Sequence, residues 1–176
     1  VEGIVNAIFF NQGHVCCAGS RLFIQESVAD IVIEKLKDRL STLIVGDPLD
    51  KNTDIGAINS VEQLKTIEKY IETGKKEGGE IYQSKCSLPK KGNWCPPTLF
   101  LNVSQSHTIV QEEIFGPVVT IMPFKTEEEV LKYANCTKYG LSATLWTENL
   151  SRAHRMAEQI ESGIVWINCW LLRDLR

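Results

Sequence analysis

Two adjacent cysteines, Cys16 and Cys17, lie in a short run of glycine, alanine and serine. A cysteine becomes a nucleophile when its thiolate is stabilised and a substrate can reach it. Small neighbours such as Gly13 and Ala18 allow backbone N–H groups to converge on one oxygen atom, as an oxyanion site requires. The run is therefore suited to covalent catalysis by a thiol. Taken alone, it is better explained by two inert cysteines that simply pack, because free cysteine is often buried.

His14 precedes Cys16 by two residues, which raises the alternative of a cysteine hydrolase with a Cys–His pair. The partners of such a pair usually come from distant parts of a chain, so we do not expect His14 to be the base. The six cysteines form no Cys-x-x-Cys pair and the three histidines are scattered, so we expect no metal site. Free thiols favour a reducing compartment, and we expect a cytoplasmic protein.

A second candidate functional group is the carboxylate of Glu113, which is followed two residues later by Phe115. A carboxylate can accept hydrogen bonds from sugar hydroxyls, and an aromatic ring can form a wall beside them. The pair could therefore hold a ribose. Without further context, a solvated glutamate and a core phenylalanine are the simpler interpretation.

Alternating helix and strand patterns surround these residues. Apolar residues at helical spacing run from residue 2 to 11, directly into the cysteine run. Three capping patterns predict helix starts, and they are Ser27 with Asp30, Ser60 with Gln63, and Thr126 with Glu129. Further strands are predicted at 22–24, 80–83, 116–121, 141–146 and 163–168, with a helix at 149–160. This alternation predicts an α/β fold, with a mostly parallel twisted sheet covered by helices on both faces.

Composition excludes several classes of protein. The 176 residues are 43% hydrophobic and 23% charged, which is typical of a globular domain. A formal charge of −3 gives no broad attraction for nucleic acid, and no apolar run approaches the ~20 residues that span a bilayer. We therefore expect neither a nucleic-acid partner nor a membrane. The chain begins without methionine or a signal peptide and ends abruptly, so we expect a fragment.

Several motifs in order resemble the NAD(P)-dependent aldehyde dehydrogenase superfamily. The cysteine signature of that family has an aromatic residue, a glycine, the catalytic cysteine and small residues, which Phe9, Gly13, Cys16 and Ala18 match. His14 departs from the usual Gln or Glu. The resemblance continues at matching spacings through Val45–Pro48, Pro97–Phe100, Glu112–Val118, Lys138–Leu141 and Gly163–Asn168.

The resemblance implies a catalytic domain over residues 1–176 that is truncated at both ends. The nucleotide-binding domain, with the glutamate that activates hydrolytic water, would lie before Val1. An intact protein of this kind would be a homo-oligomer acting on a small-molecule aldehyde with NAD or NADP. Cys16 would be the nucleophile, passing through a thiohemiacetal and a thioester. The other expected site residues are Glu113, Phe115 and Gln63 for the cofactor, and Val15, Cys17 and Arg173 for the substrate.

Two further resemblances refine this expectation. The N-terminal half is similar to the sixteenth aldehyde dehydrogenase family, in which some members have lost the cysteine, so a non-catalytic interaction module is the alternative. Retention of Cys16 favours an enzyme. Residues 168–173 are similar to the branch acting on muconic-type semialdehydes, whose substrates carry a carboxylate. Arg173 could pair with that group through its planar guanidinium, although a solvated surface arginine is an equally good interpretation.

Overall fold

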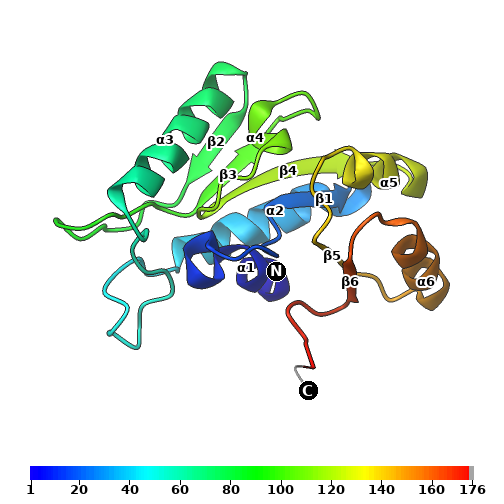
Figure 1. The fold of residues 1–176 in the computed structure, drawn as a ribbon, viewed down its shortest axis with the longest axis horizontal. Helices are drawn as coiled ribbons and strands as arrows, with labels where there is room; N and C mark the ends of the chain where they lie inside the picture. The colour runs from blue at the N-terminus through cyan, green and yellow to red at the C-terminus, as the bar shows by residue number, and fades with distance from the viewer. Residues whose placement is uncertain (175–176) are drawn as a thin grey trace.

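Helices and strands alternate along residues 1–174, the residues that the computed structural model describes (Figure 1). In chain order they are α1 (Glu2–Phe9), the 3-10 turn η1 (Phe10–Gly13), β1 (Arg21–Gln25), α2 (Glu26–Ser41), α3 (Val61–Lys76), β2 (Glu80–Gln83), β3 (Thr98–Leu101), α4 (Thr108–Gln111), β4 (Val118–Phe124), α5 (Glu127–Asn135), β5 (Ser142–Leu145), α6 (Leu150–Gln159) and β6 (Ile164–Ile167).

The main sheet has the strand order β1-β4-β3-β2. Strand β4 runs parallel to both β1 and β3, and only β2 is antiparallel to its neighbour. Figure 1 shows α3 on one face of this sheet, with α1 and α2 on the other. A mostly parallel sheet must bury both faces, and this one confirms the α/β fold expected from the sequence.

Two apolar clusters fill the space between the sheet and its helices. Leu99 and Val119 pack with α1 and α2 on one face, and α2 contributes the fully buried Leu36 and Leu40. The next residue of β3, Phe100, packs with α3 and α4 on the other face. The alternation follows from the two-residue period of a strand, which sends successive side chains to opposite faces.

Strands β5 and β6 form a separate parallel pair rather than extending the main sheet. A groove of about 770 Å³ lies between β1 and β5, and every residue of both strands lines it. The strand patterns predicted one sheet, because they do not specify which edges pair. The structure shows two sheets with a groove between them.

Two of the three predicted helix caps are confirmed. The Ser60 hydroxyl accepts a hydrogen bond from the backbone N–H of Gln63 at 3.1 Å, and Thr126 does the same for Glu129 at 3.2 Å. The pattern at Ser27 was wrong, because α2 begins at Glu26 with no side-chain cap and leaves β1 without an intervening loop. Helix α1 also ends at Phe9, two residues earlier than expected.

Candidate active site

The cysteine loop is built by an abrupt turn at the end of α1. Asn11, Gln12 and Gly13 have φ angles of 49°, 48° and 76°, all in the left-handed region. Glycine adopts this region freely and asparagine tolerates it, whereas glutamine does so at a cost. The side-chain amide of Asn11 supports the turn by donating to the carbonyl of His14 at 3.1 Å. The turn ends α1 and leads directly into the cysteine loop.

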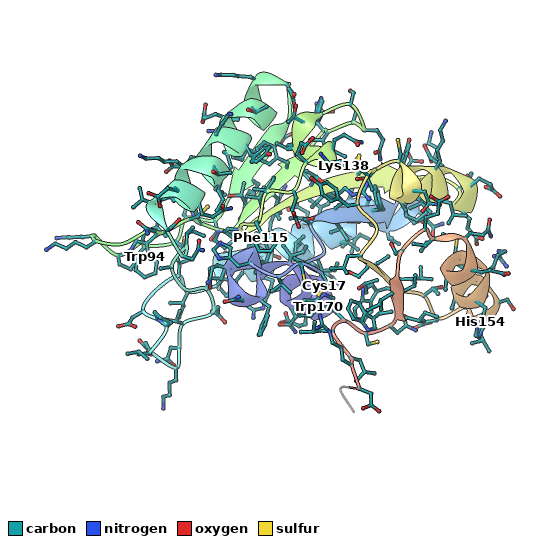
Figure 2. All side chains as sticks on the ribbon, in the orientation of Figure 1. Cys17, Trp94, Phe115, Lys138, His154 and Trp170 are labelled. Atoms are coloured by element: carbon teal, nitrogen blue, oxygen red, sulfur yellow. The ribbon has the colours of Figure 1, made fainter. Side chains whose placement is uncertain are left out.

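Cys16 and Cys17 occupy opposite environments although they are adjacent. Cys16 is exposed, whereas the Cys17 residue is only 5% exposed. The Cys17 carbonyl accepts a hydrogen bond from the Trp170 indole at 2.9 Å, and its Sγ accepts one from the Arg173 guanidinium at 3.2 Å. Cys17 and Trp170 can be followed in Figure 2. Of these two thiols, only that of Cys16 is accessible to a substrate.

Cys16 lines a small hollow of about 40 Å³ together with residues from the segment before β4. Glu113 and Phe115 lie on that segment and border the same hollow, as does Val15 from the cysteine loop. The structure thus brings together residues separated by about 100 positions in the sequence. Cys17 lines only the larger groove, which Cys16 and Glu113 also border, and Gln63 lies behind the segment on α3.

Direct backbone contact holds the cysteine loop against this segment. A Cβ atom at Gly13 would overlap the carbonyl oxygen of Gly116, so any larger residue would push the two apart. Phe115, the residue before Gly116, has a φ of 55° and is therefore also in the left-handed region. Such conformations in non-glycine residues persist only where surrounding contacts impose them, and they concentrate at functional sites.

Hydrogen bonds from two elements hold the segment in place. From α3, the side-chain amide of Gln63 donates to the carbonyls of Ile114 and Phe115, at 2.9 and 3.0 Å. From the loop before β5, the Tyr139 hydroxyl accepts from the backbone N–H of Glu113 at 3.4 Å. The same loop supplies Lys138, which pairs with Glu112 at 3.1 Å. Sequence reasoning found Lys138 and Tyr139 only as part of a motif and missed these contacts.

His14 packs on the far side of this arrangement. Its ring stacks on Phe115 with a centroid separation of 6.1 Å and an interplanar angle of 26°. Its Nε2 atom is buried and has no hydrogen-bond partner within the described part of the chain. Burial lowers the pKa of His14 below its usual 6.5, because a charged imidazolium would lose hydration there. His14 therefore packs as a neutral ring and makes no pair with Cys16.

Residues 1–174 contain neither a candidate metal site nor a membrane-spanning helix. No group of three or more histidine, cysteine, aspartate or glutamate side chains is placed to hold a metal ion there. None of the helices in this range has the length and apolar character that crossing a bilayer requires.

The structure therefore places an exposed thiol beside an exposed carboxylate and an aromatic ring, in an α/β domain with a mostly parallel sheet. The chain belongs to the aldehyde dehydrogenase family, whose model matches residues 1–176.

Relatives and solved structures agree with this assignment. The chain is 43% identical over 170 residues to the mitochondrial aldehyde dehydrogenase of Mesocricetus auratus, which covers 97% of this chain and 33% of the relative. It is 38% identical over 181 residues to 2-hydroxymuconic semialdehyde dehydrogenase of Pseudomonas sp. (strain CF600), covering 100% and 37%. An NAD+ complex of an aldehyde dehydrogenase from Bacillus cereus has a TM-score of 0.93 at 38% identity, covering 98% of this chain and 35% of that one. The chain spans about a third of the length of these relatives.

Proposed function

We propose that residues 1–176 are the cysteine-bearing catalytic domain of an NAD(P)-dependent aldehyde dehydrogenase, which oxidises a small aldehyde to a carboxylic acid. The observation that carries the proposal is the exposed Cys16 in a hollow shared with Glu113 and Phe115. Relatives of this chain bear the names of aldehyde dehydrogenases, and one solved neighbour is an NAD+ complex. These features favour an enzyme over a non-catalytic module.

Cys16 begins the reaction as a thiolate. Its sulfur forms a bond to the aldehyde carbon, and the carbonyl electron pair moves to the oxygen, giving a thiohemiacetal anion. The backbone N–H groups of Cys16 and Cys17 make no hydrogen bond to other residues in the range 1–174, so they are available to that oxygen. Donors fixed in this way stabilise charge that develops in the transition state.

Glu113 and Phe115 form the cofactor side of the site. When bound, NAD(P)+ supplies the hydride acceptor, and loss of the hydride leaves a thioester on Cys16. The exposed Glu113 carboxylate can accept hydrogen bonds from ribose hydroxyls, and the half-exposed Phe115 ring can pack beside the sugar. Water then hydrolyses the thioester, which releases the carboxylic acid and restores the thiol.

Substitution of each cysteine in the complete enzyme tests this proposal. Cys16→Ser should reduce NAD-coupled aldehyde oxidation by about 1,000-fold or more, because a serine hydroxyl is a far weaker nucleophile than a thiolate. Cys17→Ser serves as the matched control and should retain most of the activity, since Cys17 is buried. The reverse ranking would contradict the assignment of the nucleophile.

We further propose that the substrate is an acidic semialdehyde, with Arg173 as the anchor of its carboxylate. The guanidinium lies 3.2 Å from Cys17 Sγ, next to the proposed nucleophile, so a carboxylate held there would direct the rest of a short substrate towards Cys16. Arginine pairs with carboxylates through two parallel hydrogen bonds. The similarity to 2-hydroxymuconic semialdehyde dehydrogenase supports this choice.

A matched pair of substrates tests the role of Arg173. For an acidic semialdehyde against a neutral aldehyde of equal length, kcat/KM should favour the acid about 10- to 100-fold. Arg173→Ala should remove that preference and leave the neutral aldehyde unaffected. A wild-type enzyme without preference, or a variant that keeps it, would show that Arg173 does not bind the carboxylate.

We also propose a cytoplasmic homo-oligomer. All six cysteines are free in this structure, as expected of a protein in a reducing compartment. Light scattering coupled to size-exclusion chromatography of the complete enzyme would measure its oligomeric state, and a monomer would contradict the proposal.

A further inference from the structure

The peptide groups of the cysteine loop must be held in one orientation if their N–H groups are to stabilise an oxyanion. We propose that Trp170 is a positioning residue, which fixes the turn that carries Cys16 by donating its indole N–H to the carbonyl of Cys17. The inference rests on the proposed function, because Cys16 is the nucleophile there. Trp170 lies in the loop after β6, 153 positions from Cys17 in the sequence.

Cys16 and Cys17 are the two central residues of a β-turn. The turn is closed by the backbone N–H of Ala18, which donates to the carbonyl of Val15 at 2.9 Å. The N–H groups of the two central residues take no part in closing such a turn. The direction in which they point therefore depends on how the turn as a whole is oriented.

The peptide group that leaves this turn is held at both ends. Its N–H is the Ala18 donor that closes the turn, and its carbonyl, that of Cys17, accepts from Trp170 Nε1 at 2.9 Å. The Cys17 residue is 5% exposed, and a buried carbonyl without a donor costs free energy. The indole therefore favours this orientation of the turn over rotated alternatives, in which the carbonyl would lose its partner. Figure 2 shows Cys17 and Trp170 next to one another.

The Trp170 indole is itself held in place. Its ring packs edge-to-face against Phe10, with a centroid separation of 5.8 Å and an interplanar angle of 66°. The Trp166 indole on β6 donates to the carbonyl of Leu172 at 2.9 Å, which ties the loop after Trp170 back to the strand. An indole has a single N–H donor, and because that donor is used here, Trp170 has none to offer a substrate.

Two variants of the complete enzyme separate the hydrogen bond from the ring. Trp170→Phe keeps an aromatic ring beside Phe10 but removes the N–H donor. Benzothienylalanine at position 170 keeps the size and shape of the indole and carries sulfur in place of the N–H, so it tests the same bond if Trp170→Phe does not fold. Trp94→Phe is the matched control. The Trp94 indole also donates to a backbone carbonyl, that of Lys91 at 2.8 Å, in a loop that lies apart from Cys17 (Figure 2).

If Trp170 positions the nucleophile, both replacements should lower kcat/KM for aldehydes by roughly 5- to 50-fold, as expected when one buried hydrogen bond is lost. The loss should be equal for an acidic semialdehyde and a neutral aldehyde of the same length, because Arg173 keeps its own contact with Cys17. The Kd for NAD+ without aldehyde should stay unchanged. Trp94→Phe should match the wild-type enzyme in each measurement.

Alkylation of Cys16 provides a readout that separates orientation of the turn from a general loss of structure. In the reaction with iodoacetamide the thiolate sulfur bonds to carbon and iodide leaves, so no oxyanion forms and oriented N–H donors contribute little. The alkylation rate of Trp170→Phe at fixed pH should therefore stay within about 2-fold of the wild-type rate while kcat/KM for aldehydes falls.

Three outcomes would overturn the inference. The first is wild-type kcat/KM in a folded variant that lacks the indole N–H. The second is an equal loss of alkylation rate and kcat/KM, which would indicate a disrupted loop. The third is a loss confined to the acidic semialdehyde, which would indicate that Trp170 contacts the substrate. Cys16→Ser separates this inference from the proposed function. Aldehyde oxidation that persists in Cys16→Ser rejects the proposed function, whereas an inactive Cys16→Ser beside a normal Trp170→Phe rejects only the role of Trp170.

Discussion

Whether a cysteine is accessible for reaction depends on the residues that surround it in the fold, and residue type alone does not reveal them. Cys16 and Cys17 are the same amino acid at consecutive positions, yet one is exposed and the other is 5% exposed beside Trp170 and Arg173. The burial of Cys17 arises because residues more than 150 positions away fold back onto it. Spacing within the signature predicts Cys16 as the nucleophile, but the partners of Cys17 could not be found from local sequence.

His14 provides a prediction about pH at the same scale. Burial lowers the pKa of its imidazole, so the folded protein binds a proton at this site less readily than the unfolded chain does. The stability associated with the neutral, stacked ring is therefore present above pH 6.5 and is lost as the pH falls through the lowered pKa.

Replacing His14 by the glutamine usual in the family should remove this effect. Between pH 7.5 and 5.5, the melting temperature of the wild-type enzyme should fall further than that of His14→Gln. Differential scanning calorimetry across that range would measure the difference. Parallel pH profiles for the two proteins would contradict a buried, neutral His14.

Among the structural elements, close packing between two loops determines where the cysteine loop lies. The loop after α1 and the segment before β4 touch through backbone atoms at Gly13 and Gly116. Gly13→Ala would introduce a Cβ atom that overlaps a carbonyl oxygen, at a residue whose φ is 76°. We expect this substitution to destabilise the protein by on the order of 2 kcal/mol or more and to displace Cys16.

Gly19→Ala is the control for that substitution, because its Cβ would meet the nearest atom at an ordinary 3.6 Å. The free energy of unfolding and the rate of Cys16 alkylation, measured for both variants, test the prediction. If Gly13→Ala matches Gly19→Ala in both measurements, the two loops are not in the tight contact described here.

Local sequence patterns predicted where individual helices begin better than they predicted which elements contact one another. The caps at Ser60 and Thr126 were correct because a cap depends on residues within one turn of the helix start. The pattern at Ser27 failed because α2 follows directly from β1, which leaves no loop for a cap. The hydrogen bond from Gln63 to the carbonyl of Phe115 joins residues 52 positions apart. It depends on how α3 packs on the sheet, so no local sequence pattern could predict it.

At the scale of the whole molecule, the chain covers about a third of the length of its relatives. The family resemblance assigns the nucleotide-binding domain and the base that activates water to segments outside residues 1–176. We therefore expect these 176 residues alone to produce no NADH from an aldehyde and NAD+, because the cofactor cannot be held and the thioester cannot be hydrolysed. An absorbance assay at 340 nm on the purified chain would test this, and robust turnover would refute it.

We propose that Cys16 carries the acyl group during aldehyde oxidation. Acid quenching of the complete enzyme during turnover, followed by peptide mass mapping, detects such an adduct. We expect Cys16 to gain the mass of the aldehyde less two hydrogen atoms and Cys17 to remain unmodified. An adduct on Cys17, or turnover with no adduct on Cys16 under conditions where hydrolysis is slow, would contradict it.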